Sequence, residues 1–127
     1  QGCMEARSYK AGEVIYSYGE SDANLYLVRS GEVRIMAPIG DGTTLQHLAT
    51  FGRGEFFGWL AFLDRRPRSN DAVASVDSEL YVLTQEQFGF LVEEHKRIAL
   101  LLLSKMARTL AIRLRHTDEE LTLLQSN

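Results

Sequence analysis

Glycine spacing is the feature that most constrains the fold of this chain. Through the first two thirds of the sequence, glycines recur at short intervals, and the segments between them are rich in Val, Ile, Tyr and Leu. This pattern is typical of short strands joined by tight turns. The Gly-Glu pairs at 12–13 and 19–20 bracket a predicted strand over 14–16, and the turn-forming loop 38–42 precedes another strand over 45–51. We therefore predict that this part of the chain is mainly β.

The segment 24–36 carries the plainest hairpin signal. Residues 24–29 and 32–36 are both rich in apolar residues at alternate positions, and Ser30-Gly31 stands between them. Because Gly31 tolerates a positive φ, this arrangement predicts two paired antiparallel strands.

The hydrophobic period changes at Thr84 from two residues to about 3.6, which predicts helices. Thr84 and Gln87 have the spacing of a capping box, so a helix is expected to begin there with Phe88, Leu91 and Val92 on one face.

A second helix is predicted from about His95. One apolar face contains Ala99, Leu103, Met106, Leu110 and Leu114. Five further apolar residues exceed that face: Leu101, Leu102, Ile112, Leu121 and Leu124. They predict either a partner helix, and so a homodimer through this helix, or packing onto the chain's own strands.

Composition indicates a single domain. The chain has 127 residues, of which 45% are hydrophobic and 24% charged, which suits one core. Its lone cysteine, Cys3, excludes a disulfide framework and favours a reducing, cytoplasmic setting. A net charge of -3 and a pI near 5.6 argue against nucleic-acid binding by this chain.

Membrane insertion is also not expected. The longest apolar run, 98–103, is far shorter than the roughly 20 residues of a spanning helix. The N-terminus lacks the pattern of a signal peptide, and we interpret residues 1–6 as a linker.

Catalytic and metal-binding patterns are missing from the sequence. His47, His95 and His116 are scattered, so neither a metal site nor a metal-dependent cupin enzyme is expected. No nucleophile elbow or acid–base carboxylate pair is found, and we expect no enzyme. The glycines of 52–58 resemble a dinucleotide-binding pattern but lack its strand and long helix, so they are interpreted as turns.

Residues 56–74, here called the cassette segment, have the pattern of an anion site. Gly58 ends a predicted strand, a single apolar turn of helix follows, and Pro67 precedes Arg68. Free N–H groups at a helix start attract a phosphate, and a guanidinium adds a two-pronged, charge-assisted contact. Arg65 and Arg66 are interpreted as a solvated basic loop.

The cassette segment closely resembles the phosphate-binding cassette of cyclic nucleotide-binding domains, whose motif is Phe-Gly-Glu, an apolar residue and Ala, then Pro-Arg-Ser/Thr/Ala-Ala. The resemblance covers nearly the whole chain, because four glycines match the family's turn positions and 104–110 looks like its C-terminal helix. The matching glycines are Gly12, Gly19, Gly31 and Gly54.

The resemblance implies an eight-stranded antiparallel β-roll of jelly-roll or cupin-like type, followed by two helices. The single domain is then expected over 7–127, with the β-roll at 7–84, the cassette at 56–74 and the helices at 85–127.

The resemblance also implies a ligand, cAMP or cGMP, and roles for individual residues. N–H groups near Gly58, Leu60 and Ala61 would hold the exocyclic phosphate oxygens. Arg68 would neutralise the phosphate and Ser69 would add a hydrogen bond. Arg113, on the last helix, would cover the base.

Two cassette positions depart from the family pattern. Trp59 stands where the family has the glutamate that accepts a hydrogen bond from the ribose 2′-hydroxyl, and Asn70 stands where it has alanine. An indole N–H donates but cannot accept, so this ribose contact is lost. Trp59 either fills the ribose pocket or gives the ligand an apolar surface to pack on.

The sequence leaves two functions open. The first is a regulatory domain that senses a cyclic nucleotide or another small phosphate and relays binding through its C-terminal helices to an attached effector. The alternative is a degenerate, non-binding domain that serves as a dimerisation module. Because no helix-turn-helix follows Asn127, we expect a regulatory segment of a larger protein. The amino-acid sequence of the cassette segment also resembles, more loosely, that of regulatory domains of bacterial sulfate-permease-type transporters and glutaminases.

Overall fold

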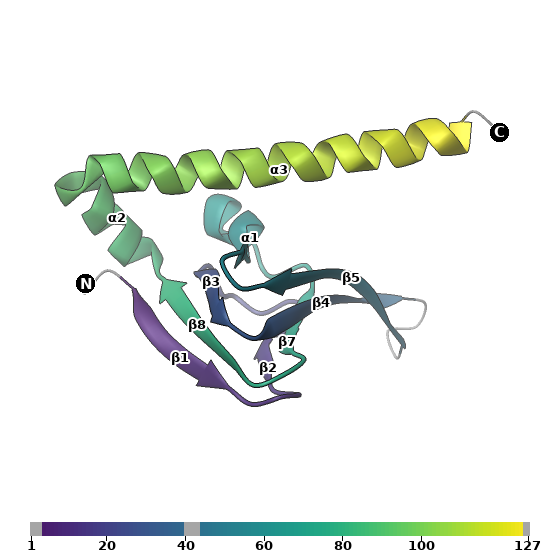
Figure 1. The fold of residues 1–127 in the computed structure, drawn as a ribbon, viewed down its shortest axis with the longest axis horizontal. Helices are drawn as coiled ribbons and strands as arrows, with labels where there is room; N and C mark the ends of the chain where they lie inside the picture. The colour runs from purple at the N-terminus through teal and green to yellow at the C-terminus, as the bar shows by residue number, and fades with distance from the viewer. Residues whose placement is uncertain (1–3, 40–43, 126–127) are drawn as a thin grey trace. The chain divides into compact units, whose positions relative to one another are not determined.

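The computed structural model describes residues 4–39 and 44–125, and within these ranges the chain forms eight strands and three helices (Figure 1). The strands are β1 (Glu5–Tyr9), β2 (Val14–Tyr16), β3 (Leu25–Ser30), β4 (Glu32–Ile39), β5 (Thr44–Gly52), β6 (Phe56–Phe57), β7 (Asp71–Ala74) and β8 (Ser78–Leu83). The helices are α1 (Trp59–Asp64), α2 (Gln85–Glu94) and α3 (Lys96–Gln125). Two compact units, 1–89 and 90–127, are described separately.

The strands of the first unit form two four-stranded sheets (Figure 1). One has the order β1-β8-β3-β6 and the other β2-β7-β4-β5, and all neighbouring pairs are antiparallel. This arrangement confirms the predicted eight-stranded β-roll with C-terminal helices. Strand β1 pairs with β8 from Glu5 opposite Val82 to Tyr9 opposite Ser78. It therefore includes Glu5 and Ala6, which the sequence placed in the linker.

The predicted hairpin at Ser30-Gly31 is wrong. Strand β3 pairs with β6 and β8, whereas β4 pairs with β5 and β7, so the two lie in different sheets. Gly31 joins them with a φ of 98°, and a Cβ there would meet the Ser78 hydroxyl and lie 2.7 Å from the Asp77 carbonyl oxygen. Only glycine fits this corner. A local Ser-Gly signal predicts a reversal of the chain, but it cannot say which sheet receives the next strand.

The Gly-Glu pairs form turns, as predicted, and a third pair behaves alike. Gly12, Gly19 and Gly54 adopt a φ of 89°, 84° and 85°. At each turn the glutamate that follows accepts a hydrogen bond from the backbone N–H three residues before it. These bonds are 2.6 Å at Glu13, 2.8 Å at Glu20 and 2.7 Å at Glu55. The repeated contact closes each turn with a charge-assisted bond.

Buried apolar side chains from both sheets form the core of the first unit. Tyr26 and Phe57 are stacked with ring centroids 5.1 Å apart, and Phe51 lies 5.9 Å from Phe57. The other fully buried large side chains are Leu25, Val28, Val33, Leu80, Val82 and Leu83. The cassette segment begins with strand β6, whose second residue is the fully buried Phe57, so the segment starts from this core.

The predicted capping box at the start of α2 is confirmed. Gln87 N donates to Thr84 Oγ1 at 3.1 Å, and Thr84 N donates to Gln87 Oε1 at 3.0 Å. Both backbone donors are satisfied reciprocally, which fixes the first turn of α2. Of the apolar face expected here, Leu91 is buried and Val92 is exposed.

Helix α3 makes up most of the second unit. Its predicted apolar face is confirmed at Ala99 and Met106, which are buried, but Leu103 and Leu114 are exposed. The unbroken apolar run 98–103 surrounds the helix, so no single stripe collects all of its apolar side chains. No helix in the described ranges is long and apolar enough to cross a membrane.

Candidate functional site

Gly58 links strand β6 to helix α1 in a conformation that requires glycine. Its φ is 80°, in the left-handed region. A Cβ on this residue would lie 3.0 Å from Arg68 Nη1 and 3.3 Å from the Asn24 carbonyl oxygen. The absence of a side chain therefore lets the Arg68 guanidinium approach the backbone at the start of α1.

The Arg68 side chain is buried, with 3% of its surface exposed. Nη1 donates to the Gly58 carbonyl oxygen at 2.8 Å. Nη2 donates to the Asn24 carbonyl oxygen at 2.6 Å and to Asp22 Oδ1 at 3.0 Å. The Arg68 backbone is fixed as well, because its N–H donates to the Glu20 carbonyl oxygen at 2.9 Å. The guanidinium thus holds the start of α1 and the loop 22–24 together.

Two tyrosines complete the surroundings of this arginine. The guanidinium carbon lies 3.9 Å from the centroid of the Tyr16 ring, a cation–π stack. The Tyr26 hydroxyl donates to Asp22 Oδ2 at 2.7 Å, which orients the carboxylate. Burial raises the pKa of Tyr16 to about 12, although the Arg68 charge opposes the shift. Burial, together with the bond to Asp22, raises the pKa of Tyr26 well above its usual range.

One polar atom of the arginine has no partner. Arg68 Nε is buried and makes no hydrogen bond with any residue that the structure describes. An unsatisfied buried donor costs roughly 1 to 3 kcal/mol, more on a charged group. The cassette segment therefore retains one donor that an oxygen of a bound molecule could satisfy.

Helix α1 has one buried and one exposed side. Trp59, Ala61 and Phe62 are buried, whereas Leu60 is 52% exposed. The Phe62 N–H donates to the Gly58 carbonyl oxygen at 3.3 Å, and the N–H groups before it belong to the first turn, where no intrahelical acceptor is available. Ser69 is exposed and its Oγ accepts a 3.3 Å bond from Asn70 Nδ2.

The sequence did not predict the residues that hold Arg68. Asp22 lies 46 residues before it and Asn24 44 residues before it. Asn24 contributes a backbone oxygen, which no residue pattern reveals. A single acid in a loop between two strands carries no local signal, and only the sheet topology brings it to the arginine.

Comparison with known proteins agrees with the fold. The family model described as "Cyclic nucleotide-binding domain" matches residues 6–95. The match includes the whole cassette segment and all eight strands, apart from the first residue of β1. The chain belongs to the cyclic nucleotide-binding domain family.

Individual members of this family align with most of the chain. The cyclic AMP receptor protein of Thermus thermophilus is 39% identical over 121 residues, which are 95% of this chain and 54% of that protein. The crystal structure of the Thermus thermophilus catabolite activator protein superposes with a TM-score of 0.83 at 38% identity, covering 97% of this chain and 55% of that one. Lysophospholipase NTE1 of Chaetomium globosum is 30% identical over 112 residues, 88% of this chain and 7% of that enzyme. The chain thus spans about half or less of these relatives.

The structure places the predicted site residues in different surroundings. Gly58, Trp59, Ala61 and Arg68, four of the predicted site residues, gather at the start of α1, and Arg68 makes direct contact with Gly58. Leu60 and Ser69 present their side chains to solvent, so any contact of Leu60 with a phosphate would come from its backbone N–H. Arg113 lies on α3 in the second unit.

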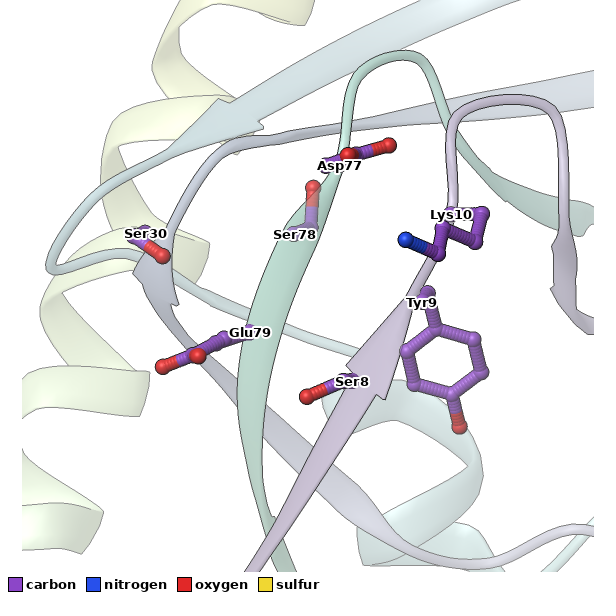
Figure 2. A pocket seen from close by; sticks show the side chains of 7 residues that line it. All are labelled: Ser8, Tyr9, Lys10, Ser30, Asp77, Ser78 and Glu79. Atoms are coloured by element: carbon purple, nitrogen blue, oxygen red, sulfur yellow. The ribbon is translucent and has the colours of Figure 1, made fainter.

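A pocket of about 320 Å³ lies elsewhere in the first unit of this cyclic nucleotide-binding domain (Figure 2). It is lined by Ser8, Tyr9, Lys10, Ser30, Asp77, Ser78 and Glu79, and no residue of the cassette segment takes part. Its acids already have partners within the chain. Asp77 accepts a bond from the Ala11 N–H at 2.9 Å, and Glu79 pairs with Arg29 at 3.0 Å. These bonds account for its two acidic side chains as part of the fold.

Proposed function

We propose that this chain is a regulatory domain that binds a cyclic nucleotide, cAMP or cGMP, or a similar small cyclic phosphate. The phosphate would bind beside the first turn of α1, where backbone N–H groups lack intrahelical acceptors. Arg68 supplies the positive charge. Leu60 and Ala61 contribute backbone donors, and Ser69 contributes its hydroxyl.

The observation that carries this proposal is the state of the Arg68 guanidinium. Two of its nitrogens are held by the chain, while Nε is buried without an acceptor among the described residues. A guanidinium aligned by its neighbours loses little entropy when it binds a phosphate. A ligand oxygen that accepts a hydrogen bond from Nε satisfies a buried donor. This contact therefore contributes more binding free energy than a hydrogen bond at the surface does.

Calorimetric titration with cAMP and with cGMP tests the proposal, with 5′-AMP as an acyclic control. We expect saturable binding of one cyclic nucleotide, weaker binding of 5′-AMP and no binding by Arg68→Ala. Binding by Arg68→Ala as strong as that of the parent chain would contradict the assignment. Trp59 cannot accept a hydrogen bond from the ribose 2′-hydroxyl. The affinity for a cyclic nucleotide is therefore expected to be about ten- to a hundredfold below that of a site with glutamate at this position.

The relay of binding to an effector is a further part of the proposal. A ligand shifts the helices only if it binds one of their arrangements better than another. Arg113 on α3 would provide such a preference by lying over the base, where an arginine–ring contact contributes roughly 0.5 to 2 kcal/mol. The effector would be another domain of the full-length protein.

A second candidate function is self-association through α3, without any ligand. The observation in its favour is the exposure of large apolar side chains along this helix: Ile98, Leu100, Leu101, Leu103, Ile112 and Leu114. Such residues on one long helix are typical of a helix that packs against a partner. A homodimer is compatible with ligand sensing, and it becomes the main function only if the cassette segment binds nothing.

A further inference from the structure

The side chain of Gln85, the first residue of α2, contacts two residues of the cassette segment and one residue of the loop 22–24. Its Nε2 donates to the carbonyl oxygen of Phe62 in α1 at 2.5 Å and to the carbonyl oxygen of Ala23 at 3.3 Å. Its Oε1 accepts a bond from Arg65 Nη2 at 3.2 Å. One amide thus joins the beginning of α2 to both α1 and the loop 22–24.

Gln85 has little freedom to move away from these contacts. It lies directly after Thr84, which forms the reciprocal capping box with Gln87, so the backbone of the first turn of α2 is fixed. Its side chain is half-buried. The Phe62 carbonyl is in the last turn of α1, where an acceptor has no intrahelical donor, and Gln85 satisfies it.

The groups that Gln85 touches are those that Arg68 holds in place. Ala23 stands between Asp22 and Asn24, the two residues that accept bonds from Arg68 Nη2. At the other end of α1, Gly58 accepts the bond from Nη1. A displacement of the Arg68 guanidinium therefore disturbs its hydrogen bonds to the loop 22–24 or to α1. Both of these segments accept hydrogen bonds from the Gln85 amide.

Arg65 adds an unusual backbone to this arrangement. It ends α1 with a φ of 60°, the only described residue other than glycine with a positive φ, and its N–H donates to the Ala61 carbonyl oxygen at 2.7 Å. A left-handed conformation is unfavourable for a residue with a side chain, and it persists only where the surroundings fix it. Because Arg65 is exposed, its bond to Gln85 contributes little by itself. The two carbonyl contacts carry most of the coupling.

We propose that Gln85 is a positioning residue that couples the cassette segment to α2. Through its amide, a movement of α1 or of the loop 22–24 changes the first turn of α2. In its ligand-driven form this coupling rests on the proposed function, but the mechanical link between Asp22, Gln85 and α2 does not require a ligand.

Hydrogen exchange of the α2 backbone amides, measured with and without saturating cAMP, tests the ligand-driven coupling. The variants are Gln85→Leu, which removes every contact, and Gln85→Glu, which keeps an acceptor for Arg65 but cannot donate to the carbonyls. Glu86→Leu, at the exposed neighbouring position, is the matched control. A net hydrogen bond is worth about 1 kcal/mol, so losing the two carbonyl contacts is expected to weaken the coupling between the cassette segment and α2 by about thirtyfold.

In this first arm, cAMP is expected to alter α2 exchange in the parent chain and in Glu86→Leu. The response should be lost in both Gln85 variants while calorimetry shows that they still bind cAMP. An unchanged response in Gln85→Leu, or a parental response in Gln85→Glu, overturns the proposal.

A second arm needs no ligand and separates this proposal from the proposed function. Asp22→Asn disturbs the loop that contacts Gln85, so it should raise exchange at the first turn of α2 in the parent chain. In the Gln85→Leu background the same substitution should add nothing. If the effects of Asp22→Asn and Gln85→Leu on exchange simply add, Gln85 does not couple the loop 22–24 to α2. The proposal is then wrong, whether or not the chain binds cAMP.

Discussion

The Arg68 guanidinium and the Asp22 carboxylate form a buried ion pair, with Nη2 3.0 Å from Oδ1 and side-chain exposures of 3% and 12%. The residue assigned to neutralise a ligand is therefore already balanced by a carboxylate of the chain. A bound phosphate would share the guanidinium with Asp22 through Nε, or it would take the place of the carboxylate. In either case the loop that carries Asp22 takes part in ligand binding.

Replacing Arg68 by alanine should destabilise the domain as well as abolish ligand binding. Breaking a buried ion pair leaves a charge without its partner, at a cost of about 3 kcal/mol. Urea denaturation of Arg68→Ala measures this loss. Arg66→Ala, in the exposed part of the same segment, is the control and should change the free energy of unfolding by less than about 0.5 kcal/mol. Equal effects of the two substitutions would show that the buried pair has no special role.

The conformation of Gly58 predicts opposite effects for two glycine-to-alanine substitutions. Gly58→Ala places a Cβ at a φ of 80° and 3.0 Å from Arg68 Nη1, so it should lower the free energy of unfolding by about 1 to 2 kcal/mol. Gly89→Ala is the matched control, because it lies inside α2 with no atom within 4 Å of the added Cβ. It should raise stability by about 0.5 to 1 kcal/mol. Thermal denaturation of both variants shows whether each substitution lowers or raises stability relative to the parent chain.

The local features of the sequence predicted much of this structure. The Gly-Glu turns and the Thr84–Gln87 capping box depend on residues a few positions apart, and all formed as expected. The turn at Gly31 was recognised, but its strands were assigned to one sheet instead of two. Sheet membership depends on long-range packing that a short pattern does not contain.

The candidate site was predicted only in part for a similar reason. Arg68 was found from its place in a recognisable segment, and its burial is consistent with a functional role. Asp22 and Gln85 were missed, because their importance comes from contacts with Arg68 and Phe62 across the fold.

Alkaline pH should destabilise the domain through its buried tyrosines. The folded chain raises the pKa of Tyr16 to about 12 and also raises that of Tyr26, whereas unfolded tyrosines ionise near pH 10. Folding thus favours the neutral phenols. Their stabilising contribution is complete below about pH 10 and is lost as the pH rises from about 10 through 12.

Urea unfolding at about pH 8 and pH 11 measures this loss. Tyr16→Phe removes one of the two shifted groups, and its stability should therefore depend less steeply on pH in this range. Tyr18→Phe, at an exposed tyrosine, is the control and should keep the parental slope. A slope that Tyr16→Phe leaves unchanged would contradict the assignment to Tyr16.

The exposed apolar surface of α3 predicts a homodimer. Leu101 is 61% exposed, and a charge at this position would be costly in a helix–helix interface. Sedimentation velocity should show a dimer for the parent chain and a monomer for Leu101→Asp. Ser104→Asp adds the same charge at an exposed polar position of the helix and should remain more dimeric than Leu101→Asp. A parent chain that stays monomeric at high concentration would exclude this interface.

The substitution of Trp59 by glutamate tests whether the cassette segment is otherwise intact. Glutamate restores an acceptor for the ribose hydroxyl, so it should strengthen cyclic-nucleotide binding by about tenfold or more. Because Trp59 is 8% exposed, the loss of its packing is expected to cost about 3 kcal/mol, and binding must be measured where the variant remains folded.

Trp59→Gln is the matched control for this substitution, since it has nearly the shape of glutamate without the charge. It should gain less affinity, because hydrogen bonds to ionised acceptors are the stronger ones. Adding Arg113→Ala to Trp59→Glu should weaken binding again by the contribution of the arginine–base contact, roughly 0.5 to 2 kcal/mol. If folded Trp59→Glu binds neither cAMP nor cGMP, more than the ribose contact has been lost, and self-association through α3 replaces ligand sensing as the function of the chain.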